Sequence, residues 1–270
     1  MAKKLSQAVI SSTKRLSFSL FGWPHLLRRI QAPYIVEYGR IEPHHLVLDL
    51  GCGGGQLTTL LEGGRLTVGC EVSSAVFHFQ STRTSAAVQG DGFSLPFKDR
   101  TFDRVILSSV LQMVDRGPAL LAEVSRILTA DGKIVLTVPC RYRFLTMAYN
   151  SDTFLYWLVR RVCGMPATYD EFQRELMAKF HSKGPGLFLR EEIERLIRDA
   201  DFRIEQWEYA PKVWGTLLYE TIVLLKYAAG ANISVAGRLP MLLYPLAYLD
   251  RFLPKSSVGC ELIMRISKAE

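Results

Sequence analysis

Residues 47–55 read Val-Leu-Asp-Leu-Gly-Cys-Gly-Gly-Gly, an apolar run that ends in four glycines within five positions. The apolar run is typical of a buried parallel strand. The glycines allow a sharp backbone turn and let a ligand approach the chain without side chains in the way. A helix expected over residues 55–62 would direct its first N–H groups at that ligand. The stretch therefore predicts a strand, a loop and a helix that together support a bound cofactor.

The glycine loop departs from two well-known phosphate-binding patterns. The dinucleotide fingerprint G-x-G-x-x-G needs a third glycine where this chain has Gln56. No Lys-Ser/Thr pair follows the glycines, which excludes a P-loop. The loop alone thus indicates a ligand site without saying which ligand it holds.

Strand signals alternate with helix signals along the chain, which implies a parallel sheet with helices on both faces. Strands are expected at 46–50, 66–70, 86–89, 103–108, 133–138, 202–209 and 258–268, and helices at 23–40, 55–62, 73–85, 117–129 and 189–200.

Four further motifs follow the glycine loop in order. Residues 66–71 form a strand signal that ends in Glu71, and residues 90–97 read Gly-Asp-Gly-Phe-Ser-Leu-Pro-Phe. Two more strand signals lie in 102–108 and 126–139. Together with the glycine loop, this series resembles the class I S-adenosylmethionine-dependent methyltransferases, in particular the branch with small-molecule and quinone methyltransferases. The resemblance covers about residues 40–140.

The resemblance implies an α/β, Rossmann-like fold. Its seven-stranded sheet would be mostly parallel, with an antiparallel last strand between the fifth and sixth and helices on both faces, plus helical insertions. The expected parts are a basic N-terminal or lid segment (1–40), a cofactor-binding core (41–140), a helical substrate cap (141–186), a core continuation (187–210), a hydrophobic helical insertion (211–255) and the last core strand (256–270).

The resemblance also implies S-adenosyl-L-methionine as cofactor and assigns residues to it. Glu71 would bind the ribose hydroxyls, Asp91 the adenine amino group, the Gly92 amide a ring nitrogen, and Phe93 would cover the adenine. The remaining members of the expected set are Asp49 near the methionine amino group, the loop glycines Gly51 and Gly53, and Ser108 at the methionine end.

An oxygen or activated carbon acceptor also needs a base that removes a proton. His181, in the first insertion, is our first candidate, followed by Tyr34 and His25. His44 and His45 precede the first strand, and ligands of such sheets bind at the opposite edge. The scattered spacing of the five cysteines predicts reduced thiols and no metal site.

The net charge of +7 is unevenly distributed, because six basic residues precede the first acidic residue, Glu37. This distribution argues against DNA binding, which favours a broad basic face. The N-terminal segment fits a basic amphipathic segment on an anionic membrane surface, an organellar transit peptide, or a disordered or lid-forming N-terminus. The insertions 141–186 and 211–255 are apolar, but their charged residues argue against transmembrane helices.

The sequence therefore predicts a methyltransferase that acts on oxygen or carbon of a quinone-, polyketide- or lipid-like molecule. A cytoplasmic enzyme that contacts a membrane surface, an organellar enzyme and a homodimer are all compatible with it. Two alternatives stay open: a methyltransferase for a polar metabolite or RNA whose insertions serve dimerisation, and a non-catalytic scaffold.

Overall fold

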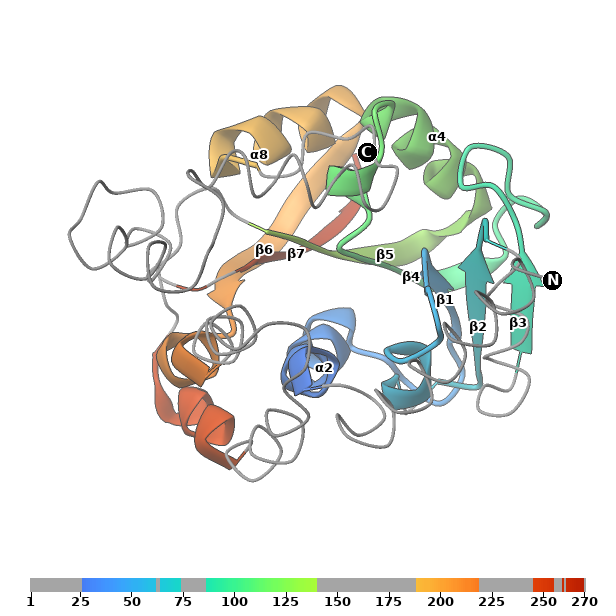
Figure 1. Ribbon diagram of the computed structural model, residues 1–270. Helices are drawn as coiled ribbons and strands as arrows, with labels where there is room; N and C mark the ends of the chain where they lie inside the picture. Colours follow the sequence, from blue (N-terminus) through green and yellow to red (C-terminus); the bar gives the residue numbers. More distant parts are fainter. Residues whose placement is uncertain are drawn as a thin grey trace, which may run out of the picture.

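A computed structural model describes residues 26–61, 64–73, 86–139, 188–218, 245–254, 259 and 261–269. Its centre is a seven-stranded sheet with the strand order β3-β2-β1-β4-β5-β7-β6 (Figure 1). The pairs from β3 to β5 are parallel, and β7 runs antiparallel to both β5 and β6. The strands are β1 (Leu46–Leu50), β2 (Leu66–Glu71), β3 (Ala86–Gln89), β4 (Phe102–Ser108), β5 (Leu128–Pro139), β6 (Phe202–Ala210) and β7 (Glu261–Lys268).

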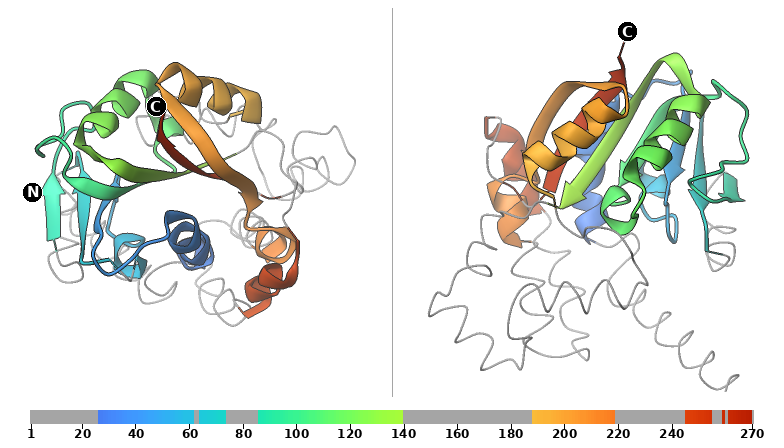
Figure 2. Two further views of the ribbon diagram at one scale, coloured as in Figure 1. Left: turned by 180° about the vertical axis from the view of Figure 1, so that it is seen from behind. Right: turned by 90° about the horizontal axis from the view of Figure 1, so that it is seen from above.

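Helices lie on both faces of the sheet, as Figure 2 shows from two further sides. On one face α4 (Gly117–Ile127) and α8 (Arg190–Asp199) pack against each other, and on the other α2 (Leu26–Gly39) contacts β5 and β7. Each face has its own cluster of buried apolar side chains. The expected Rossmann-like sheet with an antiparallel last strand is therefore confirmed.

The central strands are apolar on both faces because helices cover both. In β5, Ile134, Val135, Leu136 and Val138 are all fully buried. Such a continuous apolar run is the signature of a parallel strand covered from both sides. The strand pattern in the sequence was therefore strong enough to place this strand, although β5 begins earlier, at Leu128.

Helix α2 runs along β4 from its carboxyl end to its start and packs against β4, β5, β6 and β7. Near its start Arg28 contacts Ser108 at the carboxyl end of β4, and at its end the Gly39 carbonyl accepts a hydrogen bond from Arg104 near the start of β4. Ile35, between these contacts, is fully buried. Helix α2, which forms the end of the expected segment 1–40, therefore packs into the hydrophobic core.

The helix expected over residues 55–62 is wrong. Turns follow the glycine loop instead, and only the short 3-10 helix η1 (Thr58–Leu60) forms. Gly53 and Gly55 have positive φ, which an α-helix cannot contain. The expected helix 73–85, apart from its first residue, and the insertion 141–186 lie outside the described residues. The second insertion, 211–255, is described at 211–218 and 245–254. Across the described residues, no helix is both long and apolar enough to cross a membrane.

Candidate cofactor site

The glycine loop is tightly packed at one position and open at another. Gly51, Gly53 and Gly55 have φ values of 72, 54 and 74 degrees, where residues with side chains are strained. A Cβ added at Gly51 would lie 2.6 Å from Cγ2 of Val110, whereas one at Gly53 would meet no atom within 4 Å. A ligand can therefore approach the backbone directly at Gly53.

The carboxylate of Glu71 faces this opening from the end of β2. Its Oε2 accepts a hydrogen bond from the Gly53 N–H at 3.0 Å, and its Oε1 accepts the N–H groups of Val72 and Ser73 at 3.0 and 3.3 Å. No ion pair of Glu71 is present in the described part of the chain. A carboxylate can accept about four hydrogen bonds, so Glu71 retains acceptor capacity for a ligand hydroxyl.

Asp49, in β1, lies beneath the loop. Its side chain is buried, and its Oδ2 accepts a hydrogen bond from the Thr58 hydroxyl at 2.6 Å. Burial raises the pKa of Asp49 to about 6, although the bond from Thr58 and the charge of Arg28 counteract this. The carboxylate thus steadies η1 beyond the glycines, and its contact with a cofactor stays a prediction.

Asp91 opens a tight turn after β3. Its Oδ1 accepts the Phe93 N–H at 3.0 Å, and its carbonyl accepts the Ser94 N–H at 3.0 Å. The Phe93 ring lies 4.1 Å from the guanidinium of Arg116. A Cβ at Gly92 would lie 2.7 Å from Leu120 in α4, so this position has no room for a side chain. The turn therefore places an exposed carboxylate and an aromatic ring at the edge of the site.

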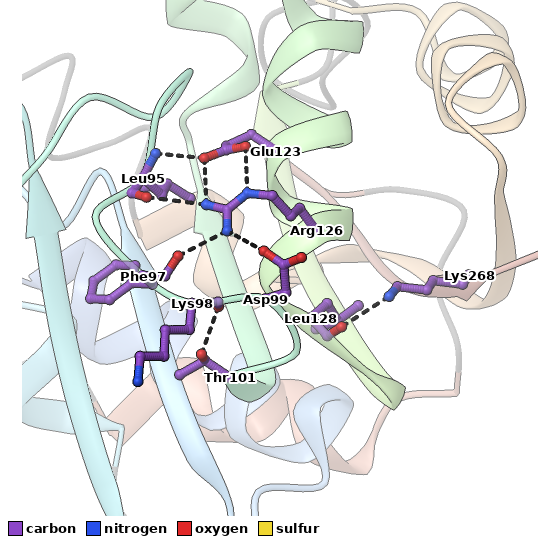
Figure 3. Close-up of polar contacts among 9 residues, drawn as sticks. All are labelled: Leu95, Phe97, Lys98, Asp99, Thr101, Glu123, Arg126, Leu128 and Lys268. Atoms are coloured by element: carbon purple, nitrogen blue, oxygen red, sulfur yellow. Dashed lines mark hydrogen bonds and ion pairs between the residues drawn. The ribbon is translucent and has the colours of Figure 1, made fainter.

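Arg126, in α4, fixes the segment that follows this turn (Figure 3). It donates to the carbonyls of Leu95 and Phe97 at 3.1 and 2.8 Å and to Asp99 at 2.7 Å. It also forms two hydrogen bonds with Glu123, whose other partner is the Leu95 N–H. The bonds from Arg126 lower the pKa of Glu123. Sequence reasoning missed this cluster, whose only local signal is the Glu-x-x-Arg spacing in α4.

The carboxyl end of β4 forms the other end of the site. Ser108 is buried, its hydroxyl lies 3.3 Å from that of Thr137, and it accepts a hydrogen bond from Arg28 Nη1 at 2.6 Å. The next residue, Ser109, has a φ of 59 degrees. A non-glycine residue in this region is strained, and such strain is concentrated at functional sites. Sequence reasoning missed Arg28.

Comparison with known proteins identifies this arrangement. Residues 48–136 match the family model of a methyltransferase domain. Over 120 residues the chain is 31% identical to a demethylmenaquinone methyltransferase of Corynebacterium kroppenstedtii, a match that covers 44% of this chain and 51% of that protein. A crystal structure of a SAM-dependent methyltransferase from Thermotoga maritima, a possible histamine N-methyltransferase, has a TM-score of 0.55 and 16% identity over 96% of this chain and 95% of its own. Residues 48–136 are therefore similar to a methyltransferase domain.

A further structural neighbour of this chain is geranyl diphosphate methyltransferase in complex with SAM. Its TM-score is 0.54 at 16% identity, over 88% of this chain and 84% of its own. Likeness at this identity shows the fold alone. The chain spans about half the length of the curated relative it matches.

The topology of the sheet arranges the candidate site residues in a row. The sheet order β3-β2-β1-β4 places Asp91, Glu71, the glycine loop and Ser108 successively along the carboxyl edge. Neighbouring strands lie about 4.8 Å apart, so the row extends over roughly 14 Å. It brings together all eight residues that the sequence predicts for the cofactor.

Of the three candidate bases, the structure describes only Tyr34. His181 and His25 lie outside the described residues. Burial and the nearby charge of Asp250 raise the pKa of the Tyr34 hydroxyl, while a backbone contact with Lys212 counteracts this. Tyr34 is therefore more firmly protonated than an ordinary tyrosine, and its role as a base stays a prediction. Tyr34 also lines a small cavity between α2 and the segment around η5 (Tyr248–Phe252). The other residues that line the cavity are Ile30, Pro33, Ala247, Tyr248 and Arg251.

His44 and His45 lie before β1, at the edge opposite the site, as expected. With Glu42 they bring three ligand-type atoms within 4.8 Å of one another. However, Nδ1 of His45 accepts the Glu42 N–H at 2.9 Å, which leaves the ring proton on Nε2. His45 therefore offers no free nitrogen to a metal ion.

Proposed function

We propose that this protein transfers a methyl group from S-adenosylmethionine to an oxygen or carbon of a lipophilic small molecule. The observation that carries the proposal is the opening at Gly53 beside the carboxylate of Glu71, which has no cationic partner in the described part of the chain. The relative from Corynebacterium kroppenstedtii supports a quinone-like acceptor, since its name specifies demethylmenaquinone.

The described residues fit the cofactor in the order in which they lie. Asp91 can accept the adenine amino group, with Phe93 against the ring, and Glu71 can accept the ribose hydroxyls. Gly53 leaves room for the nucleoside, and the β4 end around Ser108 remains for the amino-acid part. When bound, S-adenosylmethionine supplies a methyl group on a positively charged sulfur, which leaves by in-line displacement. The domain therefore contributes mainly position and alignment.

An apolar surface beyond the end of β6 supports a lipophilic acceptor. Residues 213–218 and 245–252 lie side by side there (Figure 1), joined by bonds from the Trp214 and Gly215 N–H groups to Asp250 at 2.7 and 2.9 Å. Phe252 is 85% exposed. The exposed apolar side chains of this surface are Trp214, Leu217, Leu246, Tyr248, Leu249 and Phe252. Such a mixture of aromatic and aliphatic side chains suits a membrane interface.

For the proton-removing base we retain His181 as the first candidate, followed by Tyr34 and His25. His181→Ala should lower kcat for an oxygen acceptor and leave cofactor affinity unchanged. His44→Ala, at the opposite edge, is the matched control. Equal kcat values for the His181 variant and the wild type would remove His181 from the mechanism.

The proposal is tested first by calorimetry with S-adenosylmethionine and its product S-adenosylhomocysteine. Absence of binding would overturn it. The second step is transfer of labelled methyl from the cofactor to extracted quinone and lipid pools, with pooled polar metabolites and RNA as controls. Label in the lipid-extractable fraction supports the proposal, and label only in the polar or RNA fraction contradicts the lipophilic acceptor.

Membrane contact is tested by flotation with anionic vesicles. The wild type should float with the vesicles, and Phe252→Asp should weaken this because it places a charge in the apolar surface. Ala119→Asp adds the same charge to an exposed position of α4 and should have no effect. Indifference of flotation to Phe252→Asp, together with loss of a dimer in gel filtration, would assign the surface to a second copy.

A further inference from the structure

Arg28 is a half-buried cation held at the methionine end of the row. Its Nη1 donates to the Ser108 hydroxyl at 2.6 Å and to Gln31 Oε1 at 2.9 Å. Gln31 in turn donates to Glu261 at the start of β7. Side chains from α2, β4 and β7 therefore fix the guanidinium before any ligand binds.

The charge of Arg28 has no direct counterpart. None of the ion pairs in the described part of the chain involves Arg28, and the carboxylate of Glu261 reaches it only through Gln31. The charge of Arg28 acts on the carboxylate of Asp49, but that carboxylate already accepts a hydrogen bond from Thr58. A guanidinium has five N–H donors, and the contacts to Ser108 and Gln31 both use Nη1. Among the contacts of the described residues, Nε and Nη2 thus remain for an anion.

The position of Arg28 in the row indicates which anion it would bind. It lies at the β4 end of the row, the farthest point from Asp91, where the adenine is proposed to lie. The other end of the cofactor carries a carboxylate, and a planar guanidinium binds carboxylates with paired hydrogen bonds. We propose that Arg28 binds the α-carboxylate of S-adenosylmethionine with the N–H groups that Ser108 and Gln31 leave free. This inference rests on the proposed function.

A pair of ligands isolates this contact. S-adenosylhomocysteine carries the α-carboxylate, whereas 5′-methylthioadenosine has the same nucleoside and sulfur without the amino-acid part. Calorimetry should show that Arg28→Met weakens binding of S-adenosylhomocysteine roughly 10- to 100-fold, as expected for hydrogen bonds to a charged group. Binding of 5′-methylthioadenosine should change less than about 2-fold, because the nucleoside contacts are untouched. Arg29→Met, one residue along the same helix, should leave both affinities unchanged.

The outcomes separate the inference from the proposed function. Equal weakening of both ligands would mean that Arg28 only holds α2 in place, and no weakening of S-adenosylhomocysteine would mean that it does not contact the cofactor. Both results overturn the inference. If wild-type protein binds neither ligand, the proposed function itself fails. Should Arg28→Met not fold, Arg28→Lys provides the same comparison, with a smaller loss confined to S-adenosylhomocysteine because a point charge replaces the planar fork.

Discussion

Glu71 and Glu205 are the same side chain in opposite situations. Glu205, in β6, has Lys133 Nζ at 2.6 Å from Oε1 and Arg265 Nε at 2.8 Å from Oε2. Glu71, at the end of β2, accepts hydrogen bonds from backbone amides. The first carboxylate is neutralised by cations and joins three strands, while the second keeps a net negative charge beside an opening. The comparison teaches that a carboxylate's partners, more than its burial, separate a structural role from a binding role.

The largest expected effect is on stability, at Glu205. Glu205→Ala leaves Lys133 and Arg265 without their carboxylate, and these side chains are only 25% and 10% exposed. The free energy of unfolding should fall by about 3 kcal/mol, because cations in partial burial lose their counter-charge. Urea denaturation measures it, and S-adenosylhomocysteine affinity should not change.

Glu194→Ala is the matched control for that experiment. Glu194 pairs with Arg190 four residues earlier in α8, at 2.6 Å. An i,i+4 pair on a helix contributes only about 0.3–0.5 kcal/mol. Equal destabilisation by the two variants would show that the Glu205 cluster is no stronger than an ordinary surface pair.

The pH dependence of stability sharpens the same point. Partial burial raises the pKa of Glu205, but bonds from Lys133, Ser267 and Arg265 outweigh it and lower the pKa from 4.5 to about 2. A lowered pKa adds stability that is complete above pH 4.5 and is lost as the pH falls toward 2. Between pH 5 and pH 3 the wild type should lose about 2 kcal/mol more than Glu205→Gln. Urea melts at each pH measure this, and parallel curves for the two proteins would contradict it.

At Glu71 the expected effect moves from stability to binding. Glu71→Gln removes the charge that a ribose diol would use, and its amide N–H₂ would face the Gly53 N–H. The dissociation constant of S-adenosylhomocysteine should rise roughly 30-fold, since hydrogen bonds to charged groups contribute about 1.5–3 kcal/mol. The free energy of unfolding should fall by only about 1 kcal/mol. Glu205→Gln is the control for binding, and equal affinities for all three proteins would remove Glu71 from the site.

A feature of the fold was predictable from the sequence where it depends on neighbouring residues in the chain. The strands were predictable because burial on both faces leaves continuous apolar runs, as in β4 and β5. The helix over 55–62 was wrong because Gly55, its expected first residue, has a positive φ and turns follow it. The bond from Thr58 to Asp49 is a tertiary contact without a sequence signature.

The site divides in the same way. The positions of Glu71 and Asp91 were predictable, because Glu71 ends β2, Asp91 lies two residues after β3, and neighbouring parallel strands end at one edge. Arg28 contacts Ser108 across 80 residues, and Arg126 reaches Leu95 across 31. Such contacts depend on how α2 and α4 pack on the sheet, which a linear pattern does not contain.

The smallest expected effect separates two glycines of one loop. Gly51→Ala and Gly53→Ala both place an alanine at positive φ, which costs about 1–2 kcal/mol each. At Gly51 the added Cβ would also lie 2.6 Å from the stiff side chain of Val110, while at Gly53 it meets nothing within 4 Å. Gly51→Ala should therefore lower the free energy of unfolding by about 1 kcal/mol more than Gly53→Ala, because overpacking is added to strain.

For ligand binding we expect the reverse order, with Gly53→Ala more harmful than Gly51→Ala. The methyl group of Gly53→Ala would enter the space beside Glu71 that the cofactor is proposed to occupy, so this variant should weaken S-adenosylhomocysteine binding more than its modest loss of stability suggests. Thermal melts with and without ligand measure both quantities on one sample. If Gly53→Ala retained wild-type affinity, the open side of the loop would not be where the nucleoside lies, and the contrast between Glu71 and Glu205 would lose its functional meaning.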